Sequence, residues 1–135
     1  MICVPGRMGK GGKSGSELIE LYYSSLPPSI NALWKRTRSG MRRSDAYVAW
    51  LALAAMETRQ QKPGCIVGPY CLSVQLARPD KRKRDLDNFS FKAINDLLVQ
   101  QGVVADDSLC EMLSSRWVTT GEGVAVRVSK AGVDA

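Results

Sequence analysis

Residues 78–107 combine two kinds of side chain that act on a phosphate group in opposite ways. The first seven of these residues hold five of the nineteen Lys and Arg residues, and such a basic run attracts phosphate. An Asp-x-Asp pair, Asp85 and Asp87, follows at once, and a second acidic pair, Asp106 and Asp107, comes one helix length later. Clustered carboxylates repel phosphate unless a divalent cation lies between them. The combination predicts a metal-dependent enzyme that acts on nucleic acid.

The composition narrows the chemistry further. The chain has 135 residues, which is enough for one domain with a core, and its net charge of +6 favours polyanionic partners. It contains no histidine, which excludes Ser-His and Cys-His nucleophile pairs and histidine-ligated zinc. General base work must then fall to a carboxylate, a lysine or metal-bound water. Oxygen-ligated Mg²⁺, or Mn²⁺ in its place, is the natural catalytic centre.

The four cysteines (Cys3, Cys65, Cys71 and Cys110) match no zinc-binding spacing. The sequence shows no secretory signal and no stretch of about 18 apolar residues that would span a membrane. We therefore expect four reduced thiols in a cytoplasmic protein that has no membrane attachment.

The pattern along the chain predicts a flexible basic N-terminal tail over residues 1–16 and a single domain over residues 17–131. The fold class expected is α+β, a mixed sheet of about four to five strands with two main helices packed on it. We expect strands over Glu17–Tyr23, Ile66–Ala77, Ser108–Thr120 and Val124–Lys130, helices over Ser44–Arg59 and Asn88–Gln101, and a loop or irregular strand over Asn31–Arg43. Gly121-Glu122-Gly123 indicates a hairpin between the last two strands.

Apolar periodicity gives each of the main elements a buried side. The expected core residues are Tyr47, Trp50, Leu51, Leu53, Ala54 and Met56 in the first helix, Tyr70, Leu72, Val74 and Leu76 in the strand, and Phe91, Ile94, Leu97 and Leu98 in the second helix.

The acidic residues can be brought together by the expected fold. Asp85 and Asp87 point to the same side if the chain is extended there. After the second helix the chain must turn back, which brings Asp107 near both, and a divalent cation would relieve their repulsion. Structural roles remain open, because Asp87 can cap the helix, Asp85 can form a surface ion pair and Asp107 can belong to a turn.

This block resembles the RusA family of Holliday junction resolvases. The resemblance rests on Arg84-Asp85-Leu86-Asp87-Asn88, the helix with Lys92, Gly102, and Asp106-Asp107-Ser108, with the basic run 79–84 before it. A weaker match is Leu26-Pro27-Pro28-Ser29-Ile30-Asn31. The resemblance implies a Mg²⁺-dependent homodimer that binds four-way DNA junctions and resolves them by paired nicks. Residues 17–131 would then be a RusA-like endonuclease domain in a bacterial or prophage-encoded protein.

The resemblance also assigns residues. Asp85, Asp87 and Asp107 are the implied catalytic and metal-binding acids, and Lys92 is the implied catalytic lysine, although one extra residue precedes it here. Asn88 and Asp106 would not bind the metal themselves but would hydrogen-bond to these ligands and orient them. The implied DNA-binding residues are Lys81, Arg82, Lys83 and Arg84, extended by Arg36, Arg38, Arg42 and Arg43.

Two other functions stay open on the sequence alone. One is a non-catalytic DNA-binding module of the same fold, and the other is a nuclease that prefers other branched DNA. Trp34 could stack on an unpaired base at a junction, but we expect it in the core.

Overall fold

The computed structural model describes residues 15–78, 91–119 and 121–132 of the chain. The predicted tail falls almost wholly outside them. The elements are β1 (Leu18–Tyr23), η1 (Ile30–Ala32), β2 (Trp34–Thr37), β3 (Gly40–Arg43), α1 (Asp45–Gln61), β4 (Tyr70–Ala77), α2 (Phe91–Gln100), η3 (Asp107–Leu109), β5 (Cys110–Val118) and β6 (Val124–Lys130).

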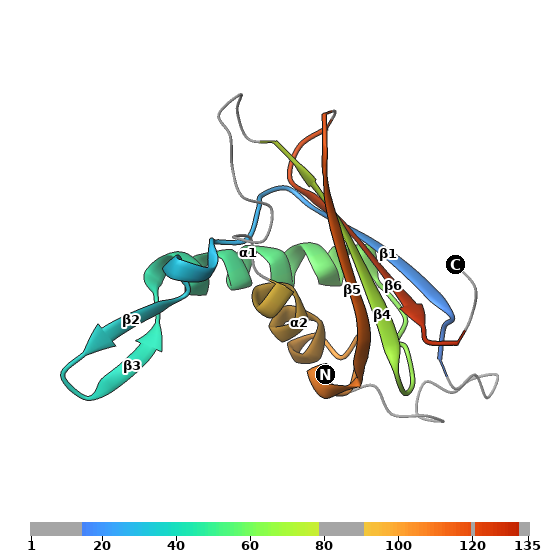
Figure 1. Ribbon diagram of the computed structural model, residues 1–135, viewed down its shortest axis with the longest axis horizontal. Helices are drawn as coiled ribbons and strands as arrows, with labels where there is room; N and C mark the ends of the chain where they lie inside the picture. Colours follow the sequence, from blue (N-terminus) through green and yellow to red (C-terminus); the bar gives the residue numbers. More distant parts are fainter. Residues whose placement is uncertain (1–14, 79–90, 120, 133–135) are drawn as a thin grey trace.

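The described strands form a four-stranded sheet in the order β1-β6-β4-β5 and a separate two-stranded sheet of β2 and β3. β4 and β5 run parallel, whereas β6 pairs antiparallel with both β1 and β4. The helices α1 and α2 lie on the same side of the larger sheet (Figure 1). The predicted fold class, an α+β domain with a mixed sheet and two main helices, is confirmed.

The predicted hairpin between the last two strands is wrong. β4 lies between β5 and β6, so these strands follow each other in the chain without pairing. The glycines marked the chain reversal correctly but carried no information on which strand β6 would join. Burial explains the order, because Val124, Val126 and Val128 of β6 are fully buried and suit a central strand. β5 exposes Met112 and Leu113 and suits an edge.

Gly123 lies in the loop between β5 and β6, where this loop packs closely against the ends of β1 and β4. It has a φ of +71°, and a Cβ atom there would lie 1.9 Å from the carbonyl oxygen of Tyr23. Its own carbonyl accepts a hydrogen bond from the amide of Ala77 at 3.0 Å. Only glycine allows the loop to approach the ends of β1 and β4 this closely.

α1 starts where the sequence predicts. The Ser44 hydroxyl accepts a hydrogen bond from the amide of Tyr47 at 3.1 Å and caps the helix. The helix continues two residues past the predicted end and stops at Lys62, which has a left-handed conformation before Pro63. Four of the six predicted core residues are buried (Tyr47, Trp50, Leu51 and Ala54), but Leu53 and Met56 are exposed because they lie on the outer side of the helix.

The core between α2 and the sheet matches its prediction closely. Tyr70, Leu72, Val74 and Leu76 alternate along β4 and are all buried against the helices, as are Ile94, Leu97 and Leu98 of α2. Phe91 packs against this core while partly buried. β4 starts at Tyr70 rather than Ile66, because Gly68 has a positive φ and Pro69 cannot donate to a neighbouring strand.

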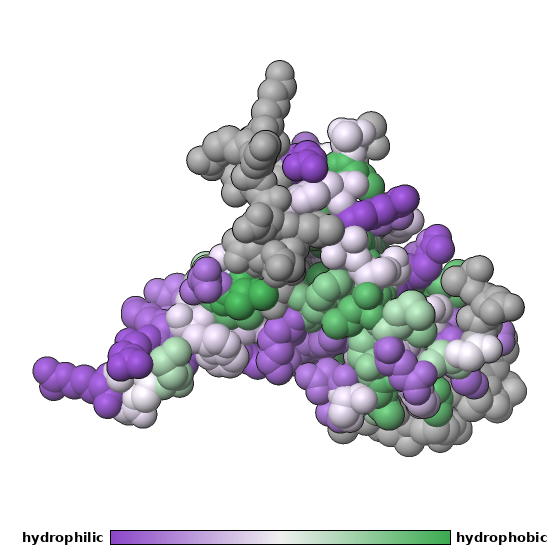
Figure 2. All heavy atoms as spheres, in the orientation of Figure 1, coloured by the Kyte–Doolittle hydropathy of each residue, from purple (hydrophilic) through white to green (hydrophobic). Residues whose placement is uncertain are grey.

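The segment predicted to be irregular contains the β2–β3 hairpin. Four residue pairs connect its strands, from Trp34 opposite Arg43 to Thr37 opposite Gly40. The hairpin extends from the start of α1 away from the large sheet (Figure 1), and it is hydrophilic over most of its visible surface (Figure 2). No residue of β2 or β3 is buried, so the hairpin contributes an arm rather than core.

The cysteines differ partly from expectation. Cys71 and Cys110 are free thiols, whereas Cys65 is buried and disulfide-bonded, so the prediction of four reduced thiols is wrong at Cys65. In the described part of the chain no helix is long and apolar enough to cross a membrane.

The fold makes Leu97 a test of the α2 packing. We expect Leu97→Ala to lower the free energy of unfolding by about 2–5 kcal/mol, because the fully buried side chain would leave a cavity. Chemical denaturation followed by circular dichroism measures the change. Leu53→Ala is the matched control on the exposed side of α1, and we expect a loss below about 1 kcal/mol. Equal losses for the two variants would contradict the assigned packing of α2.

Candidate active site

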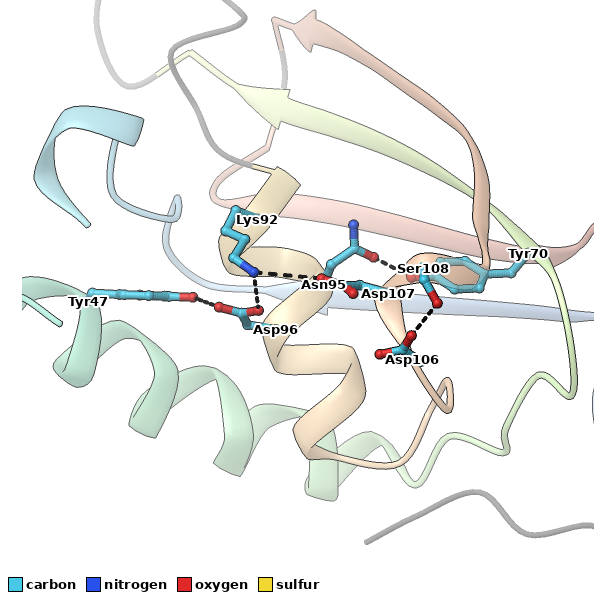
Figure 3. Close-up of polar contacts among 8 residues, drawn as sticks. All are labelled: Tyr47, Tyr70, Lys92, Asn95, Asp96, Asp106, Asp107 and Ser108. Atoms are coloured by element: carbon cyan, nitrogen blue, oxygen red, sulfur yellow. Dashed lines mark hydrogen bonds and ion pairs between the residues drawn. The ribbon is translucent and has the colours of Figure 1, made fainter. Parts of the chain in front are cut away.

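Lys92 and Asp107 meet where α2 passes beside η3. The Lys92 Nζ atom lies 3.7 Å from the Asp107 Oδ2 atom (Figure 3). Lys92 is in the first turn of α2, and Asp107 begins the short helix that leads into β5. Both side chains are partly exposed, at 53% and 41%, so a ligand can reach them. The extra residue that precedes Lys92 therefore does not turn its ammonium group away from Asp107.

Asp96 is a third charged residue at this place, and the sequence reasoning missed it. Its Oδ1 atom lies 3.3 Å from Lys92 Nζ, one helical turn along α2. Its Oδ2 atom accepts a hydrogen bond from the hydroxyl of Tyr47 on α1 (Figure 3). The side chain of Asp96 is only 15% exposed. The i,i+4 spacing of Lys92 and Asp96 in the sequence could have indicated this ion pair.

Asn95 anchors α2 to the sheet beside the charged group. The Tyr70 hydroxyl donates to Asn95 Oδ1 at 2.5 Å, and both residues are buried. Burial raises the pKa of the Tyr70 hydroxyl, and the nearby Cys110 and Asp107 raise it further. Tyr70 therefore stays protonated and remains a donor, which fixes the rotation of α2 and hence the direction of Lys92.

Asp106 has a different neighbour from Asp107. It accepts a hydrogen bond from the hydroxyl of Ser108, which lowers the pKa of the Asp106 carboxyl (Figure 3). This contact holds the turn that precedes β5 and keeps Asp106 ionised beside Asp107. Its supporting role toward a metal stays a prediction.

The other predicted residues of the acidic and basic block lie outside the described residues. These are Asp85, Asp87 and Asn88, and Lys81, Arg82, Lys83 and Arg84. Among the described residues no group of three His, Cys, Asp or Glu side chains could hold a metal ion, so the three-acid site stays a prediction. The accessible donor among the described residues, the carboxylate of Asp107, is a hard oxygen ligand and fits Mg²⁺ or Mn²⁺ rather than a soft metal.

The base of the β2–β3 hairpin reaches the same region through Tyr47. The Trp34 ring meets the Tyr47 ring edge-on, with centroids 6.1 Å apart, and the Arg43 guanidinium lies 5.4 Å from the centre of the Tyr47 ring. Trp34 is 43% exposed, so the expected core position is wrong. The remaining predicted arginines of the hairpin, Arg36, Arg38 and Arg42, are exposed along the arm.

The chain is similar to known proteins over most of its length. Residues 25–129 match the model of the family described as Endodeoxyribonuclease RusA. The chain is also 33% identical over 120 residues to the Crossover junction endodeoxyribonuclease RusA of Aquifex aeolicus (strain VF5). That match covers 85% of this chain and 94% of the relative. The resemblance found in the sequence is thus confirmed, and the chain belongs to the RusA family of endodeoxyribonucleases.

Proposed function

We propose that this protein is a Holliday junction resolvase, an endodeoxyribonuclease that binds four-way DNA junctions and cuts them. The observation that carries the proposal is the pairing of Lys92 with Asp107 on an accessible surface of a RusA family member. Phosphodiester cleavage requires stabilisation of the phosphate charge and a ligand for a divalent metal. The ammonium group of Lys92 could supply the first, and the neighbouring carboxylate of Asp107 could supply the second. The curated relative is itself named for crossover junctions.

We assign the metal to Asp85, Asp87 and Asp107, with Asn88 and Asp106 in support. The accessible carboxylate of Asp107 and the absence of histidine in the sequence favour Mg²⁺, with Mn²⁺ as a substitute. The chemistry that such an ion supplies is polarisation of the scissile phosphate and a lower pKa for an attacking water. Asp85 and Asp87 come shortly before the first turn of α2 in the sequence. Lys92, in that first turn, lies beside Asp107.

The proposed role of Lys92 is to stabilise charge on the phosphate as it is attacked. An ammonium group is a compact donor that can follow a phosphate oxygen during the reaction. Its partly exposed position beside Asp107 makes it accessible to a bound DNA backbone.

We propose that the junction backbone runs along the β2–β3 hairpin and the basic run Lys81–Arg84. Arg36, Arg38 and Arg42 are exposed on the hairpin, and their charges would neutralise phosphates without reading sequence. Arg43 and Trp34 contact Tyr47, and the Tyr47 hydroxyl binds Asp96. The base of the hairpin is therefore joined to the candidate active site by direct contacts.

Paired symmetric nicks would require two active sites, and we propose a homodimer for this reason. A four-way junction has approximate two-fold symmetry, which a two-fold symmetric pair of subunits can match. The cytoplasmic location expected from the sequence is where such a DNA substrate would be met.

The metal assignment predicts that Asp85→Asn loses cleavage but keeps binding. We expect at least an about 100-fold lower rate on a synthetic four-way junction in Mg²⁺, since one proposed ligand loses its charge. Binding of the same junction in Ca²⁺ should stay within about twofold of the parent. Gel assays on a labelled junction measure both quantities.

Glu20→Gln is the matched control, because Glu20 pairs with Arg127 away from the helices and should leave cleavage unchanged. Cleavage by Asp85→Asn at the parental rate would refute the metal assignment. If the parent binds the junction but never nicks it, the protein is a non-catalytic binding module. Faster cleavage of flaps or forks in a substrate panel would indicate a nuclease for other branched DNA.

The hairpin assignment predicts a change in the salt dependence of binding. In a triple variant, Arg36→Gln, Arg38→Gln and Arg42→Gln, the slope of log K against log salt concentration should become shallower. Each lost phosphate contact contributes about 0.9 to that slope. Fluorescence anisotropy with a labelled junction at several salt concentrations measures it. Arg127→Gln removes one exposed charge from β6 instead and should leave the slope unchanged. A change one third as large as that of the triple variant would show that only total charge matters.

A further inference from the structure

Among the residues that the structure describes, Lys92 lies within ion-pair distance of two carboxylates, and these differ in how firmly they are held. Its Nζ atom lies 3.3 Å from Asp96 and 3.7 Å from Asp107. Asp107 is 41% exposed, and the proposed function engages it with a metal. Asp96 is 15% exposed, and its two oxygens have separate partners, Lys92 on one and Tyr47 on the other. Asp96 is therefore the fixed partner and Asp107 the exchangeable one.

Tyr47 is in turn held from several sides. It is fully buried in α1, one turn after the Ser44 cap that fixes the start of the helix. The Trp34 ring meets it edge-on, and the Arg43 guanidinium covers its ring. Burial raises the pKa of its hydroxyl, and the Asp96 carboxylate raises it further, so Tyr47 stays a donor to Asp96. Hence α1 fixes the carboxylate that lies beside Lys92 on α2.

We propose that Asp96, held by Tyr47, is a positioning residue that keeps the Lys92 ammonium group at the active site when Asp107 binds a divalent cation. A cation on Asp107 repels the nearby ammonium group, since both are positive. The Asp96 carboxylate can keep its ion pair with Lys92 when the metal binds. The Asp107 carboxylate is then available to the metal, because it no longer has to balance the charge of Lys92. The proposal rests on the proposed function, because it assumes that Asp107 engages the metal.

Asp96→Asn tests this with little change of shape, because the amide oxygen can still accept the Tyr47 hydrogen bond. We expect kcat for junction cleavage to fall by about 10–100-fold, the usual effect of losing a residue that orients a catalytic group. Junction affinity in Ca²⁺ should stay within about twofold. Tyr47→Phe keeps the Asp96 charge but releases the carboxylate, and a smaller loss of kcat is expected. Melting temperatures of both variants report folding, and Tyr47→Phe carries the test if Asp96→Asn does not fold.

A binding measurement without DNA separates positioning from a general charge effect. Mn²⁺ binding, followed by electron paramagnetic resonance of the free ion, should weaken in Asp96→Asn because Lys92 loses the Asp96 charge and competes more strongly with the metal for Asp107. In a Lys92→Met background the same Asp96→Asn change should have a much smaller effect on Mn²⁺ affinity. An equal effect in both backgrounds would overturn the proposal, as would an unchanged kcat in Asp96→Asn.

These outcomes are distinct from a failure of the proposed function. If the parent does not cleave junctions in Mg²⁺, the enzyme assignment fails. The comparison of Mn²⁺ affinities in the parent and Lys92→Met backgrounds then decides by itself whether Asp96 keeps Lys92 from competing for Asp107. If the parent cleaves and Lys92→Met does not, while Asp96→Asn cleaves normally, the enzyme assignment stands and the role of Asp96 is refuted.

Discussion

The parallel pairing of β4 with β5 is the constraint on which the rest of this structure depends. Parallel neighbours cannot be joined by a tight turn, so the chain must leave the end of β4, cross one face of the sheet and return to the starting end of β5. α2 lies in that crossover, and η3 completes it. Lys92, at the start of α2, and Asp107, just before β5, both belong to this crossover, and their side chains meet although a whole helix separates them in the sequence.

Two adjacent residues of α2 fix this helix in two directions. Neighbouring positions of a helix point about 100° apart. Asn95 accordingly reaches Tyr70 on the sheet, and Asp96 reaches Tyr47 on α1. The apolar side of α2 supplies burial, but apolar contacts alone permit small rotations of a helix. The two tyrosine hydroxyls add direction, and the direction of α2 decides where the ammonium group of Lys92 lies.

The sequence was informative wherever the signal is local. The alternation from Tyr70 to Leu76 and the helical period of Ile94, Leu97 and Leu98 predicted the core, because the side chain pattern alone decides which face is buried. The strand order was not predictable, since the pairing of β6 with β1 and β4 depends on distant segments. The β2–β3 hairpin was missed because Gly40 follows the loop instead of lying within it, and because its strands bury nothing. The tyrosine contacts of Asp96 and Asn95 could not be predicted, because Tyr47 and Tyr70 lie 49 and 25 residues away from them.

Within the described part of the chain, the arm formed by β2 and β3 meets the rest of the protein at its base, where Trp34 and Arg43 contact Tyr47. Its outer positions are exposed and support no part of the core. Substitutions, insertions or deletions toward the tip therefore cost the fold little. A lineage can change the length and charge of this arm while α2 and its neighbours remain as they are, so that the shape of DNA accepted and the chemistry performed on it can evolve separately.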